Sequence, residues 1–162
     1  MQKGYKKAIV KKSLFFKNAK LLNKKFDIVP LMYGSLGLEY ITGEDLNADD
    51  IDILIPQQFL NEHWNEFKNV LEGEGYTLYD EHEHTFKNDD VSYSYASIEE
   101  LEIFGDIKIS DINEHHDSDT TFKILTLEQY LKVYSTSIKD GYRINIRQKK
   151  DQEKIEIIKR YL

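Results

Sequence analysis

The stretch LMYGSLGLEYITGEDLNADDIDILIP, residues 31–56, decides the fold predicted for this chain. An apolar run at 31–33 reads as a short strand that ends at Gly34-Ser35, and residues 35–42 suit a short helix. A polar loop follows. The β-branched run at 51–55 then predicts a second strand, which Pro56 stops. Strand, helix and strand therefore succeed one another closely here.

Two acidic residues mark the start of the second strand. Asp50 and Asp52 are two positions apart, and side chains at i and i+2 of a strand point to the same face. Two neighbouring carboxylates repel each other unless a cation lies between them. Such oxygen ligands suit Mg²⁺, which typically binds one or two protein carboxylates and the phosphates of a substrate. Taken alone, the pattern also fits a half-exposed strand with solvent-facing acids.

The Gly34-Ser35 step predicts a phosphate site. Gly34 permits a close approach to the backbone, Ser35 supplies a hydroxyl, and N–H groups at a helix start bind phosphate. Taken alone, Gly-Ser marks many ordinary turns. Combined with Asp50 and Asp52, it predicts a nucleoside triphosphate held between a glycine-containing turn and a carboxylate-bound metal.

On the N-terminal side, the pattern predicts a Lys-rich amphipathic helix closed by Asp27 and Pro30. One face of this helix is apolar at 100° per residue. Its inner residues are Ala8, Phe15, Ala19, Leu22 and Phe26.

On the C-terminal side, we expect a helix with Leu60, Trp64, Phe67 and Leu71 on one face, ending at Gly73. Next come strands at 76–86 and 91–97 around the turn 87–90, a strand at 106–112 and a polar loop at 113–121. Thr126 to Gln129 form a capping box that opens a further helix. Its inner face would hold Leu127, Leu131, Tyr134 and Ile138. After a turn at Asp140-Gly141, a last helix would bury Ile155, Ile158 and Leu162.

Length and composition predict one α+β domain. The chain has 162 residues, which is enough for one hydrophobic core. We expect a single domain at 1–162, with a mixed β-sheet flanked by helices and a C-terminal helix pair at about 126–162. The absence of Cys excludes a disulfide scaffold, thiolate zinc ligands and a catalytic thiol. We find no apolar run long enough for a membrane span and no secretory signal, so we expect a cytoplasmic protein.

The charge is distributed unevenly. Residues 1–26 contain nine Lys and no acid, whereas the rest of the chain holds 13 basic and 29 acidic residues. The basic segment would either bind nucleic acid or an anionic membrane, or form a helix that packs on an acidic body. We favour the packed helix because the segment is periodic.

Other polar and aromatic groups fit simpler roles. His82 and His84 would share a strand face and could bind Zn²⁺ or Ni²⁺, but a solvated hairpin face is the better interpretation, as it is for His115 and His116. The tyrosines at 76, 79, 93 and 95 could stack on a base together with Trp64. Aromatic residues that alternate in a hairpin more often form core.

The order Gly-Ser, short helix, Asp-x-Asp strand resembles the nucleotidyltransferase superfamily related to DNA polymerase β. The long gap at 36–49 is similar to the small antibiotic-modifying and antitoxin-type branches. The resemblance implies that Gly34 and Ser35 contact the triphosphate of ATP or another NTP and that Asp50 and Asp52 bind the metal. It extends to the helix pair, through LEQYLKVY at 127–134 and through Arg147, Lys149, Lys150 and Asp151.

Catalytic members of that family carry a third carboxylate on a later strand. The strand expected at 91–97 has Ser92 at the corresponding position in our predicted register. Asp90 lies at the edge of this strand and Asp106 begins the next. Either acid could complete the site if the register differs.

Two functions from different classes remain open. The first is transfer of a nucleoside monophosphate from Mg²⁺-NTP to a hydroxyl of a small molecule or a protein. The second is a catalytically degenerate, antitoxin-like relative that binds a nucleotide or a protein. A nucleic-acid-binding Lys helix is the least favoured hypothesis.

Overall fold

The computed structural model describes residues 2–117, 119–139 and 146–162, without the side chains of residues 2–10, 136–139 and 146–151. The chain divides into two compact units, Met1–Ile98 with Glu114–Ile124 and Glu99–Asn113 with Leu125–Leu162. Each is considered separately. The predicted turn at Asp140-Gly141, and the side chains of Ala8, Ile138, Arg147 and the Lys149–Asp151 segment, lie outside the described residues.

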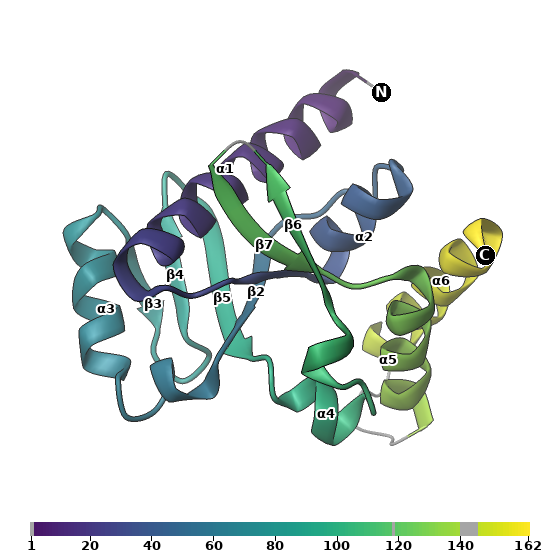
Figure 1. The fold of residues 1–162 in the computed structure, drawn as a ribbon. Helices are drawn as coiled ribbons and strands as arrows, with labels where there is room; N and C mark the ends of the chain where they lie inside the picture. Colours follow the sequence, from purple (N-terminus) through teal and green to yellow (C-terminus); the bar gives the residue numbers. More distant parts are fainter. Residues whose placement is uncertain (1, 118, 140–145) are drawn as a thin grey trace. The chain divides into compact units, whose positions relative to one another are not determined.

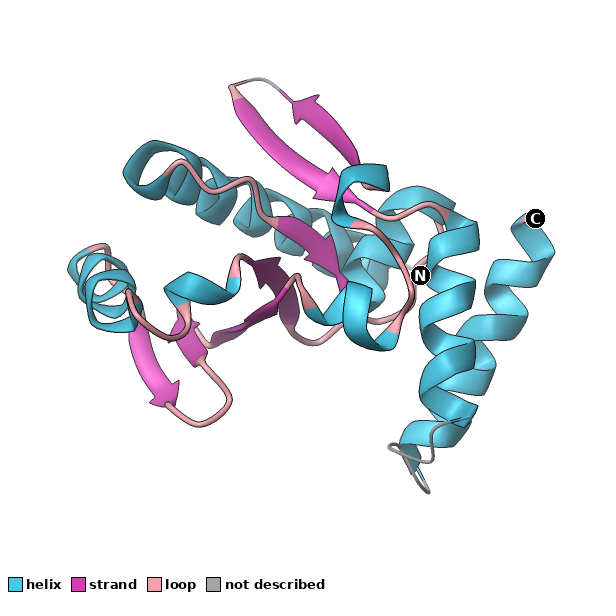
Figure 2. Cartoon of the chain, turned by 60° about the horizontal axis from the view of Figure 1, so that its bottom comes forward, coloured by secondary structure: helices cyan, strands magenta, loops and turns pink. Residues whose placement is uncertain are grey.

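A mixed seven-stranded sheet forms the centre of the first unit (Figure 1). Its strands are β1 (Leu31–Tyr33), β2 (Ile51–Ile55), β3 (Thr77–Asp80), β4 (Thr85–Asn88), β5 (Val91–Ser97), β6 (Asn113–Asp117) and β7 (Thr120–Ile124). The spatial order is β3-β4-β5-β2-β1-β7-β6. β1 runs antiparallel to β2 and parallel to β7, and β2 runs parallel to β5. The sheet with its flanking helices confirms the predicted α+β class (Figure 2).

Three α-helices belong to this unit, namely α1 (Gln2–Phe26), α2 (Gly34–Thr42) and α3 (Trp64–Gly73). Phe15, Ala19 and Leu22 of α1 are fully buried, as predicted, whereas Phe26 is half-buried against the core. The side-chain amide of Asn23 fixes the end of α1, because it donates to Ile28 O at 2.7 Å and to Thr121 O at 3.0 Å. The Lys-rich helix is therefore a packed element of the unit.

One lysine of α1 departs from the prediction that the intervening Lys residues face water. Lys11 is only 8% exposed. It lies one helical turn before Phe15 and therefore on the same face, where its aliphatic stem packs against apolar surface. Lys17, Lys20 and Lys24 are exposed as expected.

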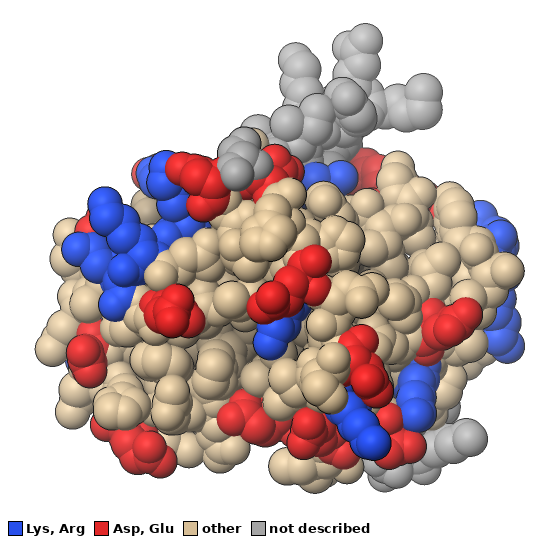
Figure 3. All heavy atoms as spheres, viewed as in Figure 1, with Lys and Arg blue, Asp and Glu red and all other residues tan. Residues whose placement is uncertain are grey.

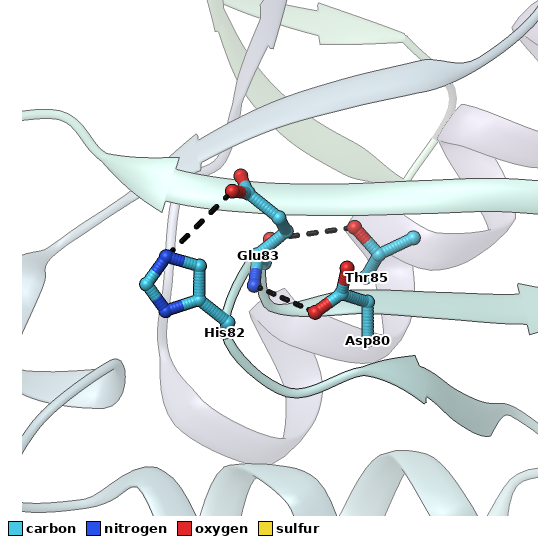
Figure 4. Close-up of polar contacts among 4 residues, drawn as sticks. All are labelled: Asp80, His82, Glu83 and Thr85. Carbon is cyan, nitrogen blue, oxygen red and sulfur yellow. Dashed lines mark hydrogen bonds and ion pairs between the residues drawn. The ribbon is translucent and has the colours of Figure 1, made fainter.

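The predicted strand 76–86 is in fact two antiparallel strands, β3 and β4. Residues 81–84 form the turn between them. Within this turn, Asp80 Oδ1 accepts the Glu83 N–H at 3.2 Å, and Thr85 Oγ1 donates to Glu83 O at 3.3 Å (Figure 4). His84 adopts a left-handed conformation with φ +50°. Side-chain bonds to the backbone of this kind stabilise turns. His82 and His84 therefore do not share a strand face.

The region after β5 also differs from the prediction. Residues 106–112 form no strand; they contain a 3₁₀ turn at Ile109–Asp111, and the expected polar loop contains β6 and the start of β7. β7 buries Thr120, Phe122 and Ile124, so its alternation is that of an inner strand. β6 is a polar edge strand, and the ring of its His115 stacks on Phe122 at a centroid distance of 5.7 Å. Edge strands pair through the backbone and tolerate charged side chains.

The second unit is helical, with α4 (Glu100–Phe104), α5 (Leu127–Lys139) and α6 (Ile146–Tyr161). The predicted capping box is present. Thr126 N donates to Gln129 Oε1 at 2.9 Å, and Gln129 N donates to Thr126 Oγ1 at 3.1 Å. The core of this unit contains Leu101, Ile107, Ile112, Leu125, Tyr130, Val133, Tyr134, Ile155 and Ile158.

The inner faces of this helix pair are predicted correctly only in part. Tyr134, Ile155 and Ile158 are buried, but Leu127 and Leu131 are half-buried. Leu162 is 59% exposed because it follows the last residue of α6. Among the described residues, no helix has both the length and the apolar character needed to cross a membrane.

Candidate functional site

The junction of β1 and α2 forms one side of the candidate site. Tyr33 ends β1 in an extended conformation, and Gly34, the first residue of α2, has φ +64°. This left-handed conformation favours glycine, since other L-residues pay a steric cost there. Gly34 is buried and Ser35 is half-buried. The predicted Gly-Ser step thus stands at a helix start.

Asp52 forms the other side of the site. It pairs with Tyr33 in the antiparallel β1–β2 register. A Cβ built on Gly34 would lie 2.5 Å from Asp52 Oδ2. The carboxylate of Asp52 therefore packs directly against the first residue of α2. Gly34 and Asp52, which are 18 positions apart in sequence, meet here. Position 34 therefore requires glycine for two reasons, its left-handed conformation and the lack of space for a side chain.

Asp50 immediately precedes β2 and is exposed, whereas Asp52 is half-buried. Between and after them, Ile51 and Ile53 are fully buried. This alternation fits the expectation that the two acids are on the opposite side from the isoleucines. Among the described residues, no group of three or more acidic or His side chains is arranged to hold a metal ion. The candidate donor set is therefore these two carboxylates.

The position opposite Asp52 on the next strand is a serine. In the parallel β2–β5 register, Asp52 pairs with Ser94, and Ser94 in turn pairs with Thr85 on β4. The hydroxyls of Ser94 and Thr85 lie 2.9 Å apart. Ser92, which we predicted at the position next to the acids, lies two residues before Ser94 on the same face of β5 and pairs with Lys87 on β4, so the residue directly across from Asp52 is Ser94. The row across three strands is thus Asp52, Ser94 and Thr85.

The two acids considered as alternatives lie elsewhere. Asp90 is in the turn between β4 and β5, exposed and at φ +64°. Asp106 does not begin a strand; it belongs to the second unit, where its carboxylate pairs with Lys132 Nζ at 3.1 Å. Neither occupies a position on β5 next to Asp52.

Among the described residues, the histidine-rich turn contains no group of three or more His or acidic side chains that could hold a metal ion. His82 is 92% exposed, and its Nε2 lies 3.9 Å from Glu83 Oε1 (Figure 4). The ring of His84 packs edge-on against Trp64 at 4.8 Å. Burial against this neighbour lowers the pKa of His84. The turn is a structural feature of the hairpin.

The tyrosines divide into core and surface. Tyr76, Tyr93 and Tyr95 are buried, so the prediction that they form core is confirmed. The rings of Tyr76 and Tyr93 meet edge-on at 5.1 Å. Tyr79 is 66% exposed, and Lys87 Nζ lies 3.9 Å above its ring centroid.

The basic and acidic groups of the surface are interspersed. On the face shown in Figure 3, blue Lys and Arg side chains lie among red Asp and Glu side chains. On α1, Lys20 Nζ pairs with Asp119 Oδ2 at 2.7 Å. Among the described side chains of this helix, Lys17, Lys20, Lys24 and Lys25 face solvent.

Two side chains of this region had not been singled out from the sequence. Glu39 of α2 contacts the loop that leads to Asp50, and its signal is a lone acid within the apolar run Leu36–Ile41. Ser94 has no such signal, because its place beside Asp52 depends on which strands pair.

Sheet and helices together define an α+β protein with a mixed sheet and a glycine–carboxylate contact at one strand end. No protein-family model matches the chain, and no solved structure matches it. The chain is 43% identical over 148 residues to "Uncharacterized protein YnaI" of Bacillus subtilis (strain 168), covering 91% of this chain and 95% of that protein. The chain therefore belongs to the same family as YnaI.

Proposed function

We propose that this protein is a nucleotidyltransferase-like protein that binds a Mg²⁺-nucleoside triphosphate, with ATP as the first candidate. Gly34 and Ser35 would contact the triphosphate, and Asp50 and Asp52 would hold the metal. The reaction would pass a nucleoside monophosphate to a hydroxyl of a small molecule or a protein.

The observation that carries this proposal is the contact between Gly34 and Asp52. It brings a carboxylate to the first residue of a helix whose N-terminal N–H groups would otherwise attract an anion. A free phosphate would be repelled by that carboxylate, whereas a phosphate that carries a divalent cation satisfies both groups. The contact thus favours a metal-bound phosphate over a bare anion.

The topology also supports the resemblance to nucleotidyltransferases. β1 leads into α2 through Gly34, and β2, with Asp52, lies between β1 and β5. This arrangement is the order of elements that the resemblance implies.

The residues present fit Mg²⁺ in their chemistry. Two carboxylates and no His or Cys form a hard oxygen donor set, and Mg²⁺ completes its shell with water and substrate phosphates. When bound, the ion would neutralise phosphate charge and stabilise the leaving pyrophosphate. The protein's own contribution would be to hold the triphosphate at the helix start and to orient it.

A second candidate is a binding protein without turnover, such as an antitoxin-like relative. It is favoured by Ser94, because a neutral hydroxyl stands opposite Asp52 where catalytic family members would place a carboxylate. A hydroxyl is a poor general base at neutral pH. Such a relative would bind a nucleotide or a protein partner, and it differs from the first candidate in that it catalyses no transfer.

Incubation with α-labelled ATP, Mg²⁺ and either a panel of hydroxyl acceptors or cell extract separates these candidates. Transfer predicts a labelled product that disappears in Asp50→Asn. Binding of Mg²⁺-ATP without product supports the second candidate. Absence of any Mg²⁺-ATP binding contradicts transfer from ATP and the nucleotide-binding form of the second candidate.

A further inference from the structure

Glu39 is a buried carboxylate on the helix that begins at Gly34. Only 1% of the residue is exposed. Its Oε1 accepts the backbone N–H of Leu46 at 3.0 Å and that of Ala48 at 3.1 Å. Its Oε2 is buried and has no hydrogen-bond partner among the described residues. Burial of a carboxylate with one oxygen unpaired is costly, so its retention in an otherwise apolar helix calls for an explanation.

The segment that Glu39 holds connects α2 to β2. Residues 43–50 have no regular secondary structure and are mostly exposed. The segment leaves α2 at Gly43 with φ +75°, and Asn47 has φ +55°. Ala48 is the buried member of this stretch, with 5% exposure. Asp50 follows two residues later. The two backbone N–H groups that Glu39 accepts thus connect α2 to this loop across seven and nine residues.

This connection joins the two halves of the candidate site. α2 carries Gly34 and Ser35 at its first turn, and the loop carries Asp50 at its end. Asp52 is already fixed by the β1–β2 ladder and by its contact with Gly34. Asp50 lies outside that ladder, between the paired residue Ile51 and the loop, so its backbone position depends on both.

We propose that Glu39 is a positioning residue, which fixes the loop 43–50 and thereby presents the carboxylate of Asp50 to the Mg²⁺-nucleotide. This inference rests on the proposed function. Glu39 does not touch the ligand; it acts through the N–H groups of Leu46 and Ala48. A ligand group that is ordered before binding costs less entropy to engage. Residues that orient metal ligands in this way typically affect metal affinity by about 10–100-fold.

If Glu39 only stabilised the fold, its replacement would lower the free energy of unfolding without changing the affinity for Mg²⁺-ATP. The test therefore compares Glu39→Met, which keeps the length but removes both acceptors, with Glu39→Gln, whose amide oxygen can still accept both N–H groups. Phe86→Leu, in the core on β4, which lies two strands away from β2, controls for loss of stability alone. Each variant is studied at a temperature well below its unfolding midpoint.

Two readouts are needed. Calorimetric titration with Mg²⁺-ATP measures affinity, and amide hydrogen exchange measures protection of Leu46 and Ala48. We expect Glu39→Met to weaken binding by about 10–100-fold and to accelerate exchange at both amides. Glu39→Gln should restore both properties to near wild type, and Phe86→Leu should leave both unchanged.

The proposal is overturned if Glu39→Met binds Mg²⁺-ATP as tightly as the wild type, or if exchange at the two amides is unaltered. If Glu39→Met does not fold, the wild type alone decides: Leu46 and Ala48 must exchange more slowly than the exposed Asp45. Failure of the wild type to bind Mg²⁺-ATP would instead contradict the proposed function, and the positioning role with it.

Discussion

The carboxylate of Asp52 occupies the space that a side chain at Gly34 would need. A Cβ at position 34 would lie 2.5 Å from Asp52 Oδ2 and 3.3 Å from Asp52 Cβ. The close approach of strand β2 to the start of α2 therefore depends on a glycine at the end of β1. Any ligand that binds the N-terminus of α2 also meets this carboxylate.

This contact predicts a specific cost for Gly34→Ala. The left-handed backbone alone should cost about 1–2 kcal/mol, and displacement of Asp52 should add about 1–3 kcal/mol, as overpacking does. Gly43→Ala is the matched control, because Gly43 has φ +75° with no atom within 4 Å of its Cβ position. Urea denaturation of both variants measures the difference.

A double-mutant cycle identifies the source of the additional cost. In an Asp52→Ala background, Gly34→Ala should cost little more than Gly43→Ala does, because the clashing oxygen is gone. Equal destabilisation by Gly34→Ala and Gly43→Ala in the wild-type background would show that the contact with Asp52 does not contribute to the change in the free energy of unfolding.

The packing of α1 predicts a large effect for Phe15→Ala. Phe15 is fully buried and meets the ring of Phe122 at 5.8 Å. Removal of a buried aromatic ring costs about 3–5 kcal/mol. Phe104→Ala, at a side chain that is 61% exposed, should change the free energy of unfolding by less than about 0.5 kcal/mol. Loss of less than about 1 kcal/mol in Phe15→Ala would mean that α1 is only loosely docked.

The buried tyrosines predict a loss of stability at alkaline pH. Burial raises the pKa of Tyr76, Tyr93 and Tyr95, most strongly for Tyr93 and Tyr95. Above about pH 10 the unfolded chain ionises these phenols while the folded chain keeps them protonated. The unfolded state then binds fewer protons, so the free energy of unfolding falls as pH rises.

Urea denaturation between pH 8 and pH 11 measures this effect. Tyr95→Phe should flatten the alkaline loss, because it removes one of the buried phenols whose pKa is raised most strongly. Tyr79→Phe, at a tyrosine that is 66% exposed, should retain the wild-type profile. A Tyr95→Phe profile as steep as that of the wild type would refute the role of burial.

How far the sequence predicts this structure depends on the range of the interactions involved. The buried face of α1, the succession β1–α2–β2 and the capping box at Thr126 and Gln129 follow from local patterns, and the structure confirms each of them. The break between β3 and β4 was missed because its signal is weak. The turn forms through Asp80 and Thr85 bonds to the backbone, without Gly or Pro.

The sequence predicts Gly34 and Asp52 as members of the candidate site, but it does not predict which residue of the neighbouring strand lies beside them. The proximity of Gly34 and Asp52 follows from adjacent strands, but Ser94 reaches its place through a parallel register between β2 and β5. Pairing between strands that are distant in sequence produces no periodic pattern in a single sequence. Similarly, the polar sequence of β6 predicts a loop, because an edge strand can be entirely polar.

The register between β2 and β5 indicates where a third carboxylate would have to lie to act together with Asp52. Ser94→Asp would place a carboxylate directly across from Asp52. We expect it to raise transfer from α-labelled ATP by about 10²-fold, at the low end for a well-placed general base. Ser92→Asp is the control, because Ser92 lies two residues before Ser94 on β5 and does not pair with Asp52. Activation by Ser92→Asp and not by Ser94→Asp would contradict the register.

The central claim is that Asp50 and Asp52, together with the Gly34-Ser35 turn, bind a Mg²⁺-nucleotide. The most direct measurement is the thermal unfolding midpoint with and without Mg²⁺-ATP, in the wild type and in Asp52→Asn. A ligand at 100 times its Kd stabilises the folded state by about 2.7 kcal/mol. We predict a clear rise in the wild type and none in Asp52→Asn, whose ligand-free form should be at least as stable because carboxylate repulsion is relieved. An equal rise in both proteins, or no rise in the wild type, would contradict the claim.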